Sequence, residues 1–212
     1  MYRPAHFRED DVARLHDFIE ARGFGLMISA GAEGPVADPL PFLLDRVGAK
    51  GVLRGHLARA NPHVGLLRAN PRALVVFSGL DAYVSPGFYP SKRDAGRVVP
   101  TWNYEIVQAR GNVRLVEDAR WLENLVAALT ARHEAGRAEP WALADAPRDF
   151  IDAQLRAIVG VEIVIDALEG KSKMSQNRGD ADRAGVASGF RKEGAEALAE
   201  RVETGGFGTR PT

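Results

Sequence analysis

The stretch GVLRGHLARANPHVGLLRANPRALVVFSG, residues 51–79, decides the fold class because it changes structure twice within a short length of chain. The segments GVLRGHL and ALVVFSG at its two ends are rich in residues that favour strands. Between them, PHVGLLRANP predicts a short helix, since proline is well tolerated in the first turn of a helix. A strand, a short helix and a second strand, joined by short loops, predict a mainly β protein.

The chain before this stretch continues the same pattern. Residues 9–22 place apolar side chains at helical spacing and are followed by a glycine, which predicts a first helix. FGLMIS, residues 24–29, predicts a strand, and a glycine-rich turn leads to a second apolar run over residues 36–44. Pro39 and Pro41 interrupt that run. Because proline removes a hydrogen-bond donor from a strand ladder, we expect an irregular edge strand there.

The chain after residue 79 adds strands and then helices. AYVSP (82–86) predicts a short strand, and NYEIVQARGNVRLV (103–116) predicts one long strand or a hairpin. VGVEIVIDALEG (159–170) alternates as a last strand. A count of about six strands at short spacing predicts a barrel or a sandwich.

The fold class expected from these patterns is α+β, mainly β, with peripheral helices and a helical C-terminal segment. One domain is expected over residues 1–190, including helices near residues 119–135 and 148–158. Residues 191–212 are expected to form a C-terminal helix and a loose tail.

The bulk composition limits the classes of function. Hydrophobic residues make up 45% of the chain and charged residues 26%, as in ordinary globular proteins. The 28 basic residues balance the 28 acidic ones, so no global field draws the chain to nucleic acid or to an anionic membrane. The sequence has no cysteine, and no apolar run approaches the length that spans a bilayer. We therefore expect a cytoplasmic protein without a membrane segment.

Common catalytic and metal-binding motifs are missing from the sequence. The five histidines show no short-range pairing such as HExxH, so we expect no metal site. No serine stands in a GxSxG elbow, and no GxGxxG lies between a strand and a helix. The sequence thus indicates neither an acyl-transfer site nor a dinucleotide fold.

Three polar stretches stand out against this background. RGHLARANPH (54–63) places donors directly before the short helix, where free amides and the helix dipole favour a phosphate. VVPTWNY (98–104) places Trp102 and Tyr104 on one face of a strand, where both could flank a planar ring. KSKMSQNR (171–178) surrounds hydroxyl and amide groups with cations, which suits an anion or the edge of a heteroaromatic ring. Spacing alone leaves the ordinary alternatives open: a solvated turn, two core aromatics and a solvated loop.

Together, HLARANPH, AYVSP with FYPSK, VVPTWNY and KSKMSQNR resemble the signatures of the PaiB-like family, the FMN-binding negative transcriptional regulators. The similarity runs in order from the initial Met-Tyr-Arg-Pro to about Phe190. It implies an FMN-binding split β-barrel, similar to that of pyridoxamine-phosphate oxidase-like proteins. It also implies a homodimer that binds FMN at the subunit interface.

The resemblance further implies which residues hold the flavin. Asn61 and His63 would be donors on the phosphate side, with Arg54 and His56 behind them on the strand. The residues expected near the flavin, or closing its site from the C-terminal segment, are Thr101, Trp102, Asn103, Lys173, Ser175, Gln176, Asn177 and Arg178.

Three functions are compatible with this pattern. The first is a flavin-linked negative transcriptional regulator; since the neutral chain shows no helix-turn-helix signature, both DNA and a regulatory protein partner stay open as contacts. The alternative is an FMN-dependent oxidoreductase acting on a small molecule, because the flavin itself supplies the redox chemistry. A weaker alternative is a haem-handling split barrel with His56, His63 or His133 as the iron ligand.

Overall fold

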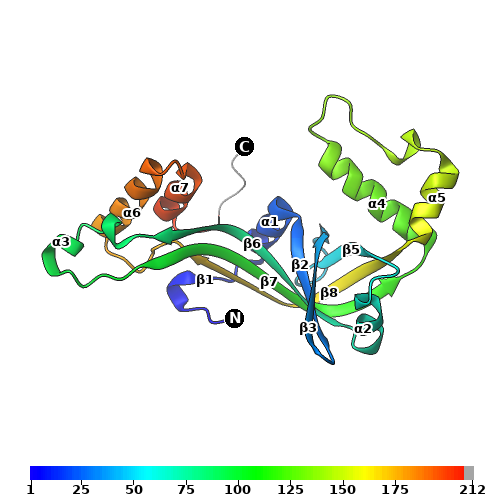
Figure 1. Cartoon of the computed structure of the whole chain (residues 1–212), viewed down its shortest axis with the longest axis horizontal. Coiled ribbons are helices and arrows are strands. Elements are labelled where there is room, and N and C mark those ends of the chain that lie inside the picture. The colour runs from blue at the N-terminus through cyan, green and yellow to red at the C-terminus, as the bar shows by residue number, and fades with distance from the viewer. Residues whose placement is uncertain (208–212) are drawn as a thin grey trace. The chain divides into compact units, whose positions relative to one another are not determined.

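The computed structural model describes residues 1–207 and divides into two compact units that share three long strands (Figure 1). Unit 1 contains Met1–Arg22, Phe77–Gln108 and Leu168–Thr212, and unit 2 contains Gly23–Val76 and Ala109–Ala167. The three long strands are β6 (Arg72–Val84), β7 (Thr101–Val116) and β8 (Ile158–Lys173). Each of them contributes residues to both units.

The strands form one open sheet. The shorter strands are β1 (Arg8–Glu9), β2 (Phe24–Gly31), β3 (Gly34–Pro41), β4 (Leu43–Asp45) and β5 (Val52–Ala58). Within residues 1–207 the order of the eight strands is β3-β2-β6-β7-β8-β5-β4, with β1 paired to β8. Every pair with a defined register is antiparallel, and the two ends of the order do not pair. The expectation of a mainly β fold is confirmed.

The long strands differ from the sequence expectation in their extent. β6 runs without a break from ALVVFSG into AYVSP, where two strands were expected. β7 is a single strand and not a hairpin. β8 continues to Lys173, so the start of KSKMSQNR belongs to a strand. Neighbouring strands hold these segments extended, and a local sequence window does not contain those neighbours.

Unit 2 contains the β2–β3 hairpin and most of the helices expected in the middle of the chain. Its helices are α2 (His63–Ala69), α4 (Ala119–Glu134), the short 3-10 helix η3 (Leu143–Asp145) and α5 (Arg148–Arg156), which confirms the helices expected near residues 119–135 and 148–158. Asp118 caps α4, since its carboxylate accepts a hydrogen bond from the Trp121 amide at 2.7 Å. β3 lies at one end of the strand order, as Pro39 and Pro41 predicted.

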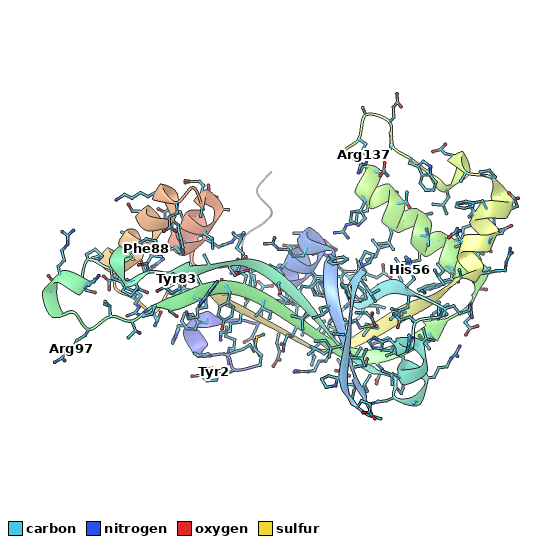
Figure 2. The ribbon with its side chains drawn as sticks, viewed as in Figure 1. Tyr2, His56, Tyr83, Phe88, Arg97 and Arg137 are labelled. Carbon is cyan, nitrogen blue, oxygen red and sulfur yellow. The ribbon has the colours of Figure 1, made fainter. Side chains whose placement is uncertain are left out.

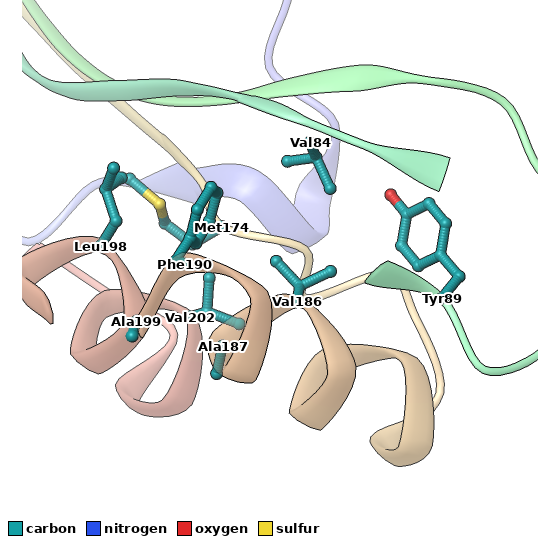
Figure 3. Packing of buried hydrophobic residues seen from close by; sticks show 9 residues of the cluster. All are labelled: Val84, Tyr89, Met174, Val186, Ala187, Phe190, Leu198, Ala199 and Val202. Carbon is teal, nitrogen blue, oxygen red and sulfur yellow. The ribbon is translucent and has the colours of Figure 1, made fainter. Parts of the chain in front are cut away.

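Unit 1 packs two C-terminal helices, α6 (Asp180–Lys192) and α7 (Glu196–Thr204), around one apolar cluster (Figure 3). The buried members of this cluster are Val84, Tyr89, Met174, Val186, Ala187, Phe190, Leu198, Ala199 and Val202. The other helical elements of unit 1 are η1 (Ala5–Phe7), α1 (Val12–Arg22), η2 (Pro86–Phe88) and α3 (Lys92–Ala95). Within residues 1–207, no helix has both the length and the apolar composition needed to cross a bilayer.

The C-terminal region holds two helices where the sequence predicted one, beginning near residue 190. α6 starts at Asp180 although Gly185 and Gly189 weaken its intrinsic helix propensity. Both glycines are needed for packing: a Cβ on Gly185 would lie 2.2 Å from the Phe88 carbonyl oxygen, and one on Gly189 would lie 2.5 Å from the Phe88 ring. Gly194, with a φ of 76°, separates the two helices.

The expected loose tail is only partly described. The Phe207 ring packs against the Phe18 ring in an edge-to-face contact with the ring centres 4.7 Å apart. The rest of the expected tail, residues 208–212, lies outside the described residues.

Candidate functional site

Unit 1 brings three cations together where β8 ends and the following loop begins. Lys171 and Lys173 lie two positions apart on β8, so their side chains point to the same face of the strand. Arg178 follows in the loop, close enough for its charge to act on Lys173. We call Lys171, Lys173 and Arg178 the cation cluster. The Lys173 ammonium donates to Thr101 Oγ1 at 2.7 Å and to the carbonyl oxygen of Trp102.

Aromatic rings line the two lysines of this cluster. The Lys171 ammonium lies 5.0 Å from the ring centre of Tyr104 and 5.6 Å from that of Tyr2. The Lys173 ammonium lies 5.9 Å from the ring centres of both Tyr104 and Phe7. Such contacts are attractive, because the faces of aromatic rings carry partial negative charge. They hold the cations in place without neutralising them.

The cation cluster has no acidic counterpart within the described residues. No carboxylate in residues 1–207 forms an ion pair with any of its members. Glu169, two positions before Lys171 on β8, instead contacts the N-terminal amine at 3.3 Å and Arg3 at 3.5 Å. Burial lowers the pKa of Lys173, and the charges of Lys171 and Arg178 lower it further. The cluster is therefore a concentration of uncompensated positive charge.

β7 carries the aromatic residues on one face and a buried amide on the other. Asn103 is fully buried, whereas Trp102 is 54% exposed. The Trp102 ring meets the Tyr83 ring edge to face, with the ring centres 6.1 Å apart; Tyr83 is labelled in Figure 2. The alternation expected for Trp102 and Tyr104 is confirmed by the burial pattern. The core interpretation is wrong for Trp102, because most of a core side chain would be covered.

Several buried polar groups of unit 1 lack a partner. Asn103 Oδ1 accepts a hydrogen bond from Ser175 Oγ at 3.2 Å, but Asn103 Nδ2 has no partner in the described part of the chain. The buried hydroxyls of Ser172 and Tyr89 also lack a hydrogen-bond partner among the described residues. Because an unsatisfied buried polar group costs about 1–3 kcal/mol, such groups are typical of places where a ligand or water binds.

Gln176 shapes the loop that follows β8. Its Oε1 accepts from the Met174 amide at 2.6 Å, and its Nε2 donates to the carbonyl oxygens of Ser172 at 2.7 Å and Gly205 at 3.2 Å. Next to it, Ser175 has a φ of 65°, a left-handed conformation that is costly for a residue with a side chain. The side chain of Gln176 therefore holds this strained loop, while Asn177 is exposed.

In unit 2, RANPH forms the turn that leads into α2. Asn61 Oδ1 accepts from the His63 amide at 2.9 Å, so its side chain satisfies the first amide of the helix. The His63 side chain is fully buried, and its Nδ1 lies 2.7 Å from Asp38 Oδ2. The other ring nitrogen, Nε2, is buried without a partner in residues 1–207. His63 thus faces inward, toward Asp38.

The charged side chains of the same stretch are already paired. Arg54 contacts both carboxylate oxygens of Asp45 at 2.6 Å, and Arg59 contacts Glu117 at 2.9 Å. Burial lowers the pKa of His56, which therefore stays neutral at pH 7. Its Nδ1 is buried and has no partner among the described residues. This part of unit 2 offers neutral donors and acceptors, while its guanidiniums face carboxylates.

The structure brings together only part of the set predicted from the sequence. Within unit 1, Lys173 meets Thr101 and the Trp102 backbone, and Asn103 meets Ser175. The residues predicted in unit 2 contact their own neighbours, as described above. Sequence reasoning missed Tyr2 and Phe7, and it singled out Lys171 and Tyr104 in their stretches without assigning them to the flavin site. The strand period links Lys171 to Lys173, but nothing local predicts that the N-terminal rings pack on them.

Comparison with known proteins places this chain in a family. The chain matches the family model described as "Putative FMN-binding domain" over residues 1–167. An uncharacterised protein of Emericella nidulans is 33% identical over 234 residues, which cover 93% of this chain and 93% of that protein. Protease synthase and sporulation protein PAI 2 of Bacillus subtilis is 28% identical over 206 residues, which cover 96% of this chain and 97% of that protein.

The solved structures agree on the fold. The FAD and heme binding protein from Mycobacterium smegmatis has a TM-score of 0.57 and 22% identity, over 78% of this chain and 73% of that chain. At this identity the likeness shows the fold alone, which is that of the split-barrel flavoproteins. With the family model covering most of its length, this chain belongs to the FMN-binding domain family.

Proposed function

We propose that this chain acts as an FMN-binding homodimer that lowers the transcription of particular genes in a flavin-linked manner. One observation supports the flavin part most directly: the cation cluster has no ion-paired carboxylate within residues 1–207. A phosphate supplies the anion that Lys173 and Arg178 lack, and the polar edge of an isoalloxazine ring supplies acceptors for a buried donor such as Asn103 Nδ2. The residues present therefore fit FMN.

Charge distinguishes the roles proposed for two of the predicted stretches, RGHLARANPH in unit 2 and KSKMSQNR in unit 1. Lys173 and Arg178 would balance the phosphate, because the guanidiniums of Arg54 and Arg59 already face carboxylates. In unit 2, considered by itself, Asn61 and the neutral His56 offer hydrogen bonds without charge, and His63 fixes the loop from inside. The remaining proposed contacts are Thr101, Trp102, Asn103, Ser175, Gln176 and Asn177. Bound flavin supplies redox chemistry, whereas these side chains bind and orient it.

The regulatory part rests on the resemblance to negative regulators and on the similarity to the B. subtilis protein named for protease synthesis and sporulation. A chain with zero formal net charge gains little from counterion release on DNA. We therefore propose that it acts through a regulatory protein partner. We place it in the cytoplasm, because a chain without cysteine fits that reducing compartment.

Replacing Arg178 with methionine tests the flavin contact. We expect Arg178→Met to raise the Kd for FMN by about 10- to 100-fold, since a hydrogen bond to a charged group contributes about 1.5–3 kcal/mol. The Kd for riboflavin, which lacks the phosphate, should stay unchanged. Fluorescence titration of both flavins measures this difference.

Arg97→Met is the matched control, because Arg97 is an exposed arginine of unit 1 (Figure 2). It should leave both dissociation constants unchanged. Equal losses of FMN and riboflavin binding in Arg178→Met, or no loss of either, would contradict the assignment of Arg178 to the phosphate.

The regulatory role is tested by comparing transcripts in three strains. Deleting the gene should raise a defined set of transcripts, and the wild-type gene should restore them. The Arg178→Met gene should fail to restore them if flavin binding is required. An unchanged set of transcripts in the deletion strain would refute the regulatory proposal and leave flavin binding untouched.

A further inference from the structure

We infer that Lys171, together with Tyr104 and Tyr2, forms a second anion site in unit 1, which binds a planar aromatic molecule that carries a carboxylate or a phosphate. We call these three residues the Lys171 subsite. The inference rests on the proposed function, because it assigns the FMN phosphate to the other two members of the cation cluster.

The charge of the FMN phosphate does not match that of the whole cation cluster. A phosphate monoester carries about 1.5 to 2 negative charges at pH 7, which two cations balance. The cation cluster has three members, so one of its positive charges stays unbalanced after the FMN phosphate has bound. Lys171 is the member best hidden from water, since only 8% of this residue is exposed. A buried ammonium without a counterion is unfavourable, and a second anion removes that cost.

Within residues 1–207 the protein supplies no carboxylate counterion for Lys171. Glu169 is the acid two positions before Lys171 on the same face of β8, and it is occupied by the N-terminal amine and by Arg3. Within residues 1–207 the Lys171 ammonium contacts the rings of Tyr104 and Tyr2. These rings position the ammonium but leave its charge available to a ligand.

The aromatic rings near Lys171 favour a planar ligand. Tyr2 is 82% exposed, so its ring can move aside, or stack on a ligand, with little loss of buried area. The exposed rings of Trp102 and Tyr83 extend the aromatic surface of unit 1; Figure 2 labels both Tyr2 and Tyr83. A planar ring gains from stacking on such side chains. An anionic group attached to an aromatic ring therefore matches the subsite better than an anion alone.

The backbone that carries Lys171 is held in place by close packing. Lys171 pairs with Arg8 of β1 in the sheet and follows Gly170, where a Cβ would lie 2.3 Å from the Leu15 side chain. This close packing of β8 against α1 fixes the backbone at Lys171. A binding group on a fixed strand loses little entropy when a ligand arrives.

Calorimetric titration of the FMN-saturated protein tests the subsite at constant ionic strength. Benzoate and phenyl phosphate represent the two anionic groups, and benzamide is the neutral counterpart. We expect at least one of the two anions to bind with one molecule per chain, while benzamide does not bind. Lys171→Met should weaken the anion at least tenfold, Lys171→Arg should retain most of the binding, and the exposed Lys92→Met should behave like wild type.

Two further measurements separate a binding role from a structural one. Without ligand, Lys171→Met should melt at a higher temperature than wild type, because it removes a buried charge and keeps an apolar stem. Its Kd for FMN should rise far less than that of Arg178→Met, because Lys171 acts on the phosphate only through the charge that it adds near Lys173. A lower melting temperature would mean that the ammonium already has a partner in the protein, and a loss of FMN over riboflavin as large as that of Arg178→Met would mean that Lys171 holds the flavin phosphate. Either result overturns the inference, as does equal binding of benzoate and benzamide.

Flavin-free protein separates the test of the Lys171 subsite from the test of flavin binding. A wild-type protein that binds neither FMN nor riboflavin refutes the flavin proposal. Titrating benzoate into the same flavin-free protein still measures the Lys171 subsite, with Lys171→Met as its reference. Binding of the anion there, lost in the variant, supports the subsite, and its absence refutes it.

Discussion

Replacing Glu105 with alanine should lower the free energy of unfolding by about 3–5 kcal/mol, the range for breaking one side of a buried ion pair. The Glu105 side chain is completely buried in unit 1. One of its carboxylate oxygens lies 2.8 Å from Arg201 of α7, and the other lies 3.7 Å from Arg22 of α1. The variant removes the carboxylate that links both helices to β7. Urea denaturation monitored by circular dichroism measures the loss.

The double variant Glu105→Ala/Arg201→Met is the control for this ion pair. Because it removes the guanidinium as well as the carboxylate, it should be more stable than Glu105→Ala alone. Strictly additive losses would contradict an energetic link between α7 and β7 through this pair.

Glu105 should also give the protein a distinctive dependence of stability on pH. Burial raises the pKa of Glu105 above its ordinary value of 4.5, and the charges of Arg201 and Arg22 only partly oppose this. Between 4.5 and the raised pKa, the folded state holds a proton that the unfolded state has released. This contribution to stability is therefore complete below pH 4.5 and is lost as the pH rises through the folded-state pKa. Glu105→Gln does not titrate at this position. Its free energy of unfolding, measured by urea denaturation at a series of pH values, should therefore lack this decrease with rising pH.

The second large effect is expected for Gly185→Ala, which should destabilise the protein by about 3 kcal/mol, at the upper end for overpacking. An alanine Cβ would lie 2.2 Å from the backbone carbonyl oxygen of Phe88, so α6 would have to move away from η2. Intrinsic propensity alone predicts the opposite sign, because alanine is the better helix former. Thermal denaturation decides between the two.

Gly65→Ala is the matched control, since Gly65 lies in the helix α2 and a Cβ there has no neighbour within 4 Å. It should stabilise the protein by about 0.5–1 kcal/mol through helix propensity. If both variants are stabilised, the packing of α6 against Phe88 is not the reason for the glycine at position 185.

The candidate site could be predicted from the sequence only in part. The strand period was enough to place Trp102 and Tyr104 on one face and Asn103 on the other, because side chains alternate along any strand. It did not predict that Arg54 would face Asp45 or that His63 would turn inward to Asp38. Those partners lie on other strands, and a charge count along the chain does not distinguish a paired guanidinium from a free one.

The sequence by itself determined the mainly β fold class, the edge position of the proline-bearing strand and the helices of the middle segment. Each of these follows from local rules, namely strand alternation, the missing amide of proline and helical periodicity. Only the tertiary structure decided that α6 forms despite Gly185 and Gly189, since the Phe88 contact outweighs their poor propensity. It also decided which cations remain without carboxylates. Lys171 and Lys173 became an uncompensated pair because β8 extends to residue 173 and the N-terminal segment covers it with aromatic rings instead of acids.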